Sequence, residues 1–156
     1  MTIICFKDGV LAADSSVTED GMAYGLMRKI IRSPKGILAG AAGDASAISP
    51  FLRWVSLGMK ARGKPKIEGD LDGMVIYQNG EISFFESNLV PFKVSSPFHA
   101  VGSGQQMGIG AMAADKSAVE AVEIVCQRIV TCRGPIQALR LDGATHELDP
   151  TRLGID

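Results

Sequence analysis

The first fifteen residues read MTIICFKDGVLAADS, from Met1 to Ser15. The run from Thr2 to Phe6 predicts a β-strand, Lys7-Asp8-Gly9 predicts a tight turn, and Val10 to Ala13 predicts the returning strand. An Asp-Gly pair between two apolar runs is a strong hairpin signal. The chain is therefore expected to begin with a buried β-hairpin that ends at Asp14.

Thr2 carries a chemical possibility of its own. Once Met1 is removed, Thr2 has a hydroxyl group and a free α-amine on one residue. The amine has an ordinary pKa near ~7.7–8.0, so it can take the proton of its own hydroxyl at neutral pH and activate it as a nucleophile. A retained Met1 would turn that amine into an amide and abolish the base. Threonine is common after methionine, so this pair of residues alone does not identify an enzyme.

The composition is that of a soluble globular protein. The chain has 156 residues, 46% of them apolar and 21% charged, with a net charge of −1. We expect a single domain over residues 1–156 with its own core. A net charge this close to zero gives no overall electrostatic attraction to nucleic acid or to an anionic membrane. No run approaches the ~20 apolar residues of a membrane span, and no signal peptide is recognisable, so a cytoplasmic location is predicted.

Cysteine and histidine usage argues against a metal or cofactor. The three cysteines, Cys5, Cys126 and Cys132, form no CxxC pair, and the two histidines are His99 and His146. A set of this kind fits a reducing compartment better than a disulfide framework. We expect no metal site and no cofactor.

Turn signals divide most of the chain into paired strands. The polar stretch from Ser15 to Gly25 is expected to be a loop, and Gly58 to Gly69 an exposed basic loop for which solvation is favoured over phosphate contact. Pro- and Gly-containing turns predict further strands. These cover residues 27–31 and 36–41, 73–77 and 81–86, 99–102, and 136–141 and 144–148.

Helices are expected between the strands. Asp44 is a good N-cap for an amphipathic segment, in which Pro50 either kinks the helix or marks its true start. A second helix is predicted from Gly104 to Ala114, and Ser117 with Glu120 forms a capping box before a third. Hairpins with helices clustered between them predict an α+β fold, with antiparallel sheets covered by helices.

Lys29 is an unusual residue for its place in the chain. It lies in an otherwise apolar predicted strand, where a lysine usually points outward. A lysine that points inward needs a carboxylate, because an unpaired buried ammonium is costly. Asp14, at the end of the first hairpin, is the natural partner. A cation held beside Thr2 would favour proton loss from both its hydroxyl and its amine.

Two glycine-rich turns join strands to helices. The run AGAAGD at residues 39–44 either allows close packing or frees the backbone N–H of Gly40 to donate to a developing oxyanion. The run VGSG at residues 101–104 has the wrong spacing for a dinucleotide-binding loop. Its Ser103 hydroxyl can instead reach a neighbouring site.

Taken in order, these segments resemble the proteasome β-subunits and the bacterial HslV-type protease, which are N-terminal-nucleophile hydrolases. The resemblance runs from Thr2 to about Leu141. It is carried by GVLAADS at residues 9–15, Arg28-Lys29-Ile30, LAGAAGD at 38–44, VGSG at 101–104 and Gly110-Ala111-Met112. It implies a four-layer αββα sandwich of two antiparallel sheets flanked by helices.

The resemblance also implies residue roles. Thr2 resembles the nucleophile and base, Lys29 the lysine that tunes it, and Asp14 the anchor of that lysine. Gly40 would supply the oxyanion N–H, and Ser103 the hydroxyl that supports the amine. The implied reaction is acyl transfer from a peptide to Thr2, followed by hydrolysis.

The implied substrate is a peptide or unfolded protein. The loops that line the family's substrate pocket place Val17, Met27, Leu38 and Ala42 there, and their apolar side chains suit an apolar residue before the cleaved bond. The family also implies a homo-oligomeric ring. Any ATPase partner is not visible in the sequence.

The chain departs from the family's pattern in several places. An aspartate near the end of the last long helix falls at Ile129, and a nearby serine falls at Cys132. The first strand is short enough for Met1 to align with the nucleophile, and only one helix fits between Asp44 and Gly69, where the family usually has two. An active threonine peptidase and a catalytically degenerate subunit with a structural or assembly role both stay open, as does a small-ligand binding module on an unrelated α+β fold.

Overall fold

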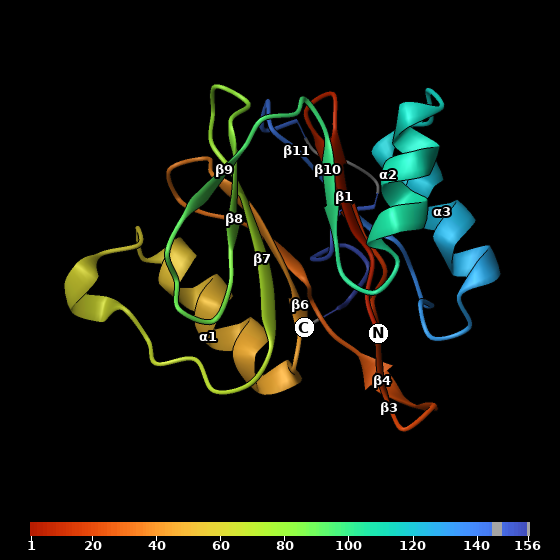
Figure 1. Cartoon of the computed structure of the whole chain (residues 1–156), viewed down its shortest axis with the longest axis horizontal. Helices are drawn as coiled ribbons and strands as arrows, with labels where there is room; N and C mark the ends of the chain where they lie inside the picture. The colour runs from red at the N-terminus through yellow and green to blue at the C-terminus, as the bar shows by residue number, and fades with distance from the viewer. Residues whose placement is uncertain (145–147, 156) are drawn as a thin grey trace.

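The protein is an α+β structure with antiparallel sheets. A computed structural model describes residues 1–144 and 148–155, and within them three sheets and three α-helices (Figure 1). The α+β prediction is confirmed. The predicted strand at 144–148 includes residues 145–147, and these, with His146 among them, lie outside the described residues.

The N-terminal hairpin forms the centre of a four-stranded sheet with the order β10-β1-β2-β11. Asp8 and Gly9 make the turn with φ of 49° and 75°, which is the left-handed backbone that an Asp-Gly hairpin turn requires. All pairings in this sheet are antiparallel. Its strands are β1 (Ile4–Lys7), β2 (Val10–Ala13), β10 (His99–Val101) and β11 (Gln137–Arg140).

The second sheet has five strands in sequence order, β5 to β9. Two of its hairpins are those predicted from the Pro-Lys-Gly and Asn-Gly turns, whereas no turn signal predicts β9. The strands are β5 (Ile30–Arg32), β6 (Leu38–Gly43), β7 (Leu71–Ile76), β8 (Ile82–Phe85) and β9 (Phe92–Val94).

The stretch from Ser15 to Gly25 is not a loop, so that prediction is wrong. It contains most of a third, two-stranded sheet made of β3 (Ser16–Glu19) and β4 (Met22–Leu26). Asp20 and Gly21 form its turn with φ of 49° and 76°. Asp20-Gly21 repeats the Asp-Gly signal of the first hairpin. The polar composition of the segment around it nevertheless indicates a loop, which is why the hairpin was not predicted.

The three helices are α1 (Ala45–Ser56), α2 (Gln105–Ala113) and α3 (Ala118–Arg128). Asp44 is the N-cap residue of α1, and the helix continues through Pro50, so Pro50 does not mark its start. The capping box of α3 is confirmed, because Glu120 N–H donates to Ser117 Oγ (3.1 Å) and Ser117 N–H to Glu120 Oε2 (2.8 Å). The predicted exposed loop at 58–69 contains only a short 3₁₀ turn, Ala61–Gly63.

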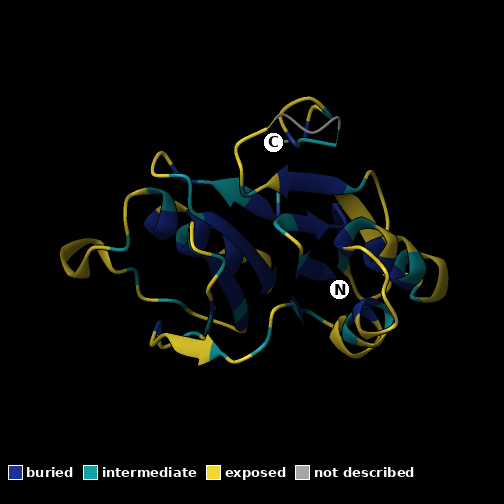
Figure 2. Ribbon diagram, turned by 90° about the horizontal axis from the view of Figure 1, so that it is seen from above, coloured by how far each residue is buried: buried dark blue, intermediate teal, exposed yellow. Residues whose placement is uncertain are grey.

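Most residues in the strands of the two large sheets are buried (Figure 2), and their side chains contribute to clusters on both faces of each sheet. Ile4 and Phe6 pack toward the second sheet, against residues such as Met74. Ile3 and Cys5 point the other way, into the cluster formed with α2 and α3. The opposite face of the second sheet packs against α1, so α1 and the α2–α3 pair lie on opposite sides of the molecule (Figure 1). No helix in the described ranges is long and apolar enough to cross a bilayer.

Candidate active site

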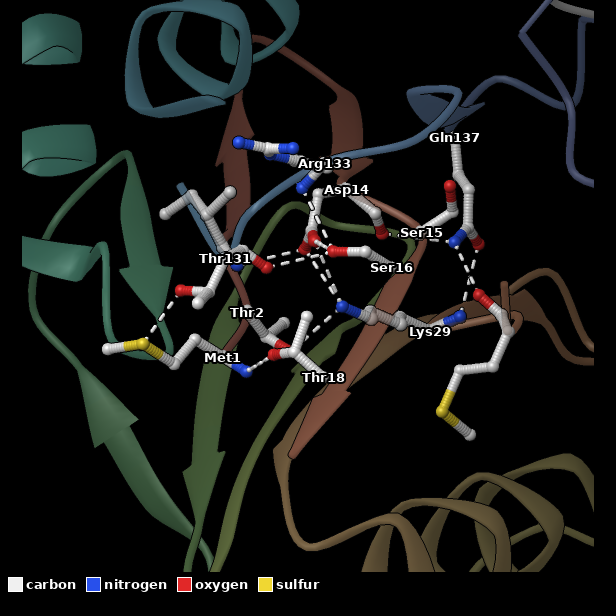
Figure 3. Close-up of polar contacts among 12 residues, drawn as sticks. Met1, Thr2, Asp14, Ser15, Ser16, Thr18, Lys29, Thr131, Arg133 and Gln137 are labelled. Carbon is white, nitrogen blue, oxygen red and sulfur yellow. Dashed lines mark hydrogen bonds and ion pairs between the residues drawn. The ribbon is translucent and has the colours of Figure 1, made fainter. Parts of the chain in front are cut away.

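Thr2, Lys29 and Asp14 meet in the interior of the protein (Figure 3). Lys29 Nζ donates to Thr2 Oγ1 at 2.9 Å and lies 3.0 and 3.1 Å from the two carboxylate oxygens of Asp14. Lys29 is 1% exposed and Asp14 is fully buried. The inward-pointing lysine and its carboxylate partner, inferred from the sequence, are therefore in contact, and the ammonium lies against the Thr2 hydroxyl.

Burial and ion pairing act in opposite directions on Lys29. Removal of its ammonium from water lowers the pKa of Lys29, while the charge and hydrogen bonds of Asp14 raise it, and burial has the larger effect. Asp14 is held by two further donors, Ile3 N–H at 3.1 Å and Ser16 Oγ at 2.9 Å. A lysine with a lowered pKa, fixed by an anchored carboxylate, is suited to share a proton with a hydroxyl.

Ser103 contacts the backbone of Thr2. Thr2 N–H donates to Ser103 Oγ at 3.2 Å, and Ser103 Oγ lies 3.3 Å from Thr2 O. The neighbouring Gly102 has a φ of +101°, and a Cβ there would collide with the carbonyl oxygen of Thr2. Glycine is therefore required for β10 to end this close to Thr2, and the turn at residues 101–104 sets the position of the Ser103 hydroxyl.

Gln137 and Ser16 support the site, and sequence reasoning missed both. The buried Gln137 amide accepts from Lys29 N–H at 3.1 Å and donates to Asp14 O at 3.1 Å and Met27 O at 2.9 Å. A lone glutamine in an apolar strand is the only sequence signal for it. Ser16 Oγ, which donates to Asp14, also accepts from Arg133 N–H at 2.9 Å, so it ties the carboxylate to the segment after α3.

A cavity of about 330 Å³ opens beside Thr2. Val17 and Met27 line it, in agreement with the resemblance. Leu38 and Ala42 are not in its lining, because both side chains pack into the core between the two large sheets. The structure thus brings two of the four predicted substrate-binding residues to the cavity. The remaining lining comes from Met1, Thr2, Lys29, β3 residues 16–19 and residues 43–46 with Ile48.

Gly40 lies away from this cavity. It is in the middle of β6, opposite Ile30 of β5 and Met74 of β7. Its absent side chain makes room for Ile4 and Ile30, whose methyl groups would lie 2.9 and 3.2 Å from an added Cβ. The position has the close packing that a run of small residues predicts, and the structure does not bring Gly40 into contact with the other candidate residues.

Gly43, at the end of β6, presents its backbone to the cavity instead. Ala41 N–H donates to Lys29 O at 3.0 Å on the β5 side, and Asp44 N–H donates to Asp70 O at 2.9 Å on the β7 side. Because the amides of successive strand residues point to opposite sides, the Gly43 N–H points away from β7, toward the cavity that Gly43 lines. Its φ is +117° and a Cβ there would collide with Asp70 O, so glycine is necessary at this position.

Met1 occupies the entrance to the site. Its terminal amine donates to Thr18 Oγ1 at 2.8 Å, and its sulfur accepts from Thr131 Oγ1 at 2.7 Å (Figure 3). While Met1 is attached, the nitrogen of Thr2 is an amide and has no basic lone pair. The Thr2 hydroxyl and Lys29 are therefore in contact while Met1 is attached.

The two departures from the family's pattern near the end of α3 are Ile129 and Cys132. Neither side chain supplies the carboxylate that the resemblance leads one to expect there. Ile129 is the C-cap residue of α3 and packs against the cluster under α2 and α3. Cys132 is fully buried, and burial, with the charge of Asp14, raises the pKa of its thiol to about 11. A thiol with a pKa this high is protonated at neutral pH and is a poor nucleophile.

Comparison with known proteins adds no family assignment. Neither the models of protein families nor the curated proteins give a match to this chain. Its function is accordingly inferred from the residues of the site and their geometry. Among the described residues, no group of three or more His, Cys, Asp or Glu side chains is arranged to hold a metal ion.

Proposed function

We propose that this protein is an N-terminal-nucleophile hydrolase, a threonine-type peptidase that acts through Thr2 after Met1 is removed. The observation that carries the proposal is the 2.9 Å contact of Thr2 Oγ1 with Lys29 Nζ, whose ammonium is paired with the fully buried Asp14. A buried cation in contact with the Thr2 hydroxyl favours the deprotonated form of that hydroxyl. Burying the Lys29–Asp14 pair costs desolvation energy that a hydrophobic pair would avoid, which is consistent with a functional reason for its presence.

The proposed reaction begins with proton transfer within Thr2. The free α-amine takes the hydroxyl proton through the hydrogen-bonded site, and Oγ1 attacks the carbonyl carbon of the peptide bond. The Gly43 N–H donates to the negative oxygen of the tetrahedral intermediate. The C–N bond then breaks, the leaving amine takes the proton from the Thr2 ammonium, and an ester to Thr2 remains. Water hydrolyses that ester, with the amine again acting as base.

The fold supports placing this activity in the proteasome β-subunit and HslV type. Two large antiparallel sheets pack face to face through one cluster, and helices cover both outer faces. We infer that this arrangement is the four-layer αββα sandwich of that family. The proposal extends to a peptide or unfolded-protein substrate and a homo-oligomeric ring, with an ATPase partner as a further component to be sought.

A catalytically degenerate subunit with a structural or assembly role is the second candidate. It is favoured by the seated Met1, whose amine and sulfur both have partners, and by Ile129 at the position of the family's aspartate. In this case the buried Lys29–Asp14 pair would be retained only as a core element. The two candidates differ in whether Thr2 becomes the terminal residue.

Intact mass and covalent labelling separate the candidates. We expect the natively expressed protein to lack one methionine mass and to react with an electrophilic peptide probe such as a peptidyl vinyl sulfone, with the adduct on Thr2. Thr2→Ser keeps labelling and peptide turnover, and Thr2→Ala loses both. Retention of Met1 in fully folded protein, or labelling that survives Thr2→Ala, excludes Thr2 as the nucleophile and leaves the structural role.

A further inference from the structure

A second cavity, lined by arginines, lies apart from the Thr2 site. It has a volume of about 490 Å³ and is bounded by β5, by α1 and by the C-terminal segment. Arg32 of β5, Arg28 just before that strand and Arg53 of α1 all line it. No residue lines both this cavity and the one at Thr2, so the two cavities are separate sites.

The charges in this arginine cavity are unbalanced. Three guanidinium groups face one carboxylate, that of Asp149, which gives the lining a net charge of +2. Within residues 1–144 and 148–155, none of the three arginines forms an ion pair. Asp149 uses one carboxylate oxygen to accept from Thr151 N–H at 2.8 Å. Arg32 donates to Arg140 O, and its charge helps to lower the pKa of the nearby Asp142, so Arg32 is partly balanced. Arg28 and Arg53 form no ion pair in the described part of the chain, so the cavity keeps an excess of positive charge.

Arg28 also has a buried donor without an acceptor. Its Nη2 donates to Ile155 O at 3.3 Å, but its Nε is buried and has no hydrogen-bond partner among the described residues. A buried N–H of a charged group is costly to leave unsatisfied, and native proteins leave few of them. The Nε–H therefore lies at a cavity with two further arginines and has no acceptor among residues 1–144 and 148–155.

We propose that the arginine cavity binds a phosphoryl group carried by a small molecule. A phosphate monoester has a charge between about −1.5 and −2 at neutral pH, which matches the net +2 of the lining, and guanidinium groups are the preferred donors to such oxygens. The volume is in the range of small-molecule sites. One phosphate oxygen accepts from Arg28 Nε, and Arg32 and Arg53 neutralise the remaining charge.

Calorimetric titration with inorganic phosphate tests the proposal at constant ionic strength. We expect saturable binding by the wild-type protein, and a Kd raised about tenfold by Arg28→Gln, as expected for loss of a charged hydrogen-bond partner. Arg53→Gln changes an exposed side chain, so its fold is expected to be intact, and it should weaken binding likewise. Arg62→Gln, in the exposed 3₁₀ turn outside the cavity, is the matched control and should bind as the wild type does.

Two results would overturn the phosphoryl assignment. One is the absence of saturable phosphate binding by folded wild-type protein, or equal binding by all four proteins. The other is tighter binding of malonate than of phosphate with the same dependence on Arg28 and Arg53, which would assign the cavity to a dicarboxylate. Phosphate-dependent thermal stabilisation, compared with an equal ionic strength of NaCl, gives an independent readout, because a ligand that binds only the folded state raises Tm. None of these measurements depends on peptidase activity.

Discussion

Replacing Asp14 by asparagine tests the central ion pair directly. The substitution keeps the shape of the side chain but removes the charge that faces Lys29, whose ammonium is 1% exposed. Removal of one partner from a buried pair costs about 3–5 kcal/mol, because the other charge is left unpaired. For a domain of this size each kcal/mol lowers Tm by roughly 2–4 °C, so we expect Asp14→Asn to lower Tm by about 6–20 °C.

Urea unfolding followed by circular dichroism measures this cost, with two companion variants. Glu81→Gln breaks a pair with Lys93 of similar length, 2.9 Å, whose side chains are 50% and 68% exposed, and should cost far less than Asp14→Asn because water screens an exposed pair. The double variant Asp14→Asn with Lys29→Met removes both charges and should recover most of the loss. If Asp14→Asn costs no more than Glu81→Gln, or the double variant is no more stable than Asp14→Asn, the Lys29–Asp14 contact does not behave as a buried ion pair.

Four further outcomes are expected. Gly43→Ala should abolish peptide turnover and destabilise the fold, by at least the roughly 1–3 kcal/mol of a left-handed backbone, because its Cβ also collides with Asp70 O. Gly40→Ala meets side-chain methyl groups of Ile4 and Ile30 and no backbone atom, and should keep turnover; the reverse pattern in an activity assay returns the oxyanion role to Gly40. Ser103→Ala should lower kcat about 5–10-fold and leave KM unchanged, as expected for loss of one neutral hydrogen bond. An unchanged kcat would argue against a role of the Ser103 hydroxyl in supporting the Thr2 nitrogen. Burial and the nearby Glu86 raise the pKa of Asp72 above its ordinary 3.8, so the charged form of Asp72 opposes folding. Asp72→Asn should therefore raise the free energy of unfolding at neutral pH. This gain should vanish below pH 3.8, and urea titrations at both pH values check it. Analytical ultracentrifugation should find a ring-sized assembly, and a monomer alone contradicts the predicted ring.

The strongest local signals in the sequence predicted much of the framework. An Asp-Gly turn between apolar runs has one favourable hairpin geometry, and the strand Val10–Ala13 has the predicted bounds. For Lys29 the sequence favoured an outward-pointing side chain and named Asp14 as its partner only for the inward case, because an isolated buried charge is costly. The structure has the inward case, with Lys29 directly before β5. The loop prediction failed at residues 16–26, where β3 is short and mostly polar and β4 is exposed along its length. The turn at Asp20-Gly21 and the alternation of Met22, Tyr24 and Leu26 are the sequence signals for this hairpin.

The remaining parts of the site depend on tertiary register. Gly40 and Gly43 lie in one run of small residues, and which of them borders the cavity depends on the register in which Ala41 N–H donates to Lys29 O. A run without side-chain alternation does not fix that register. Gln137 contacts residues more than 100 positions away, and a single polar residue has no periodicity that would reveal such a contact.

The distribution of the site along the chain has a consequence for synthesis. On a ribosome, Thr2, Asp14 and Lys29 emerge early, but Ser103 follows Thr2 by 101 residues and Gln137 follows Lys29 by 108. The nascent polypeptide thus holds the Thr2 hydroxyl without the strands that orient it. If the proposed hydrolase activity holds, the site is complete only after the C-terminal portion has docked, so translation itself delays the onset of cleavage.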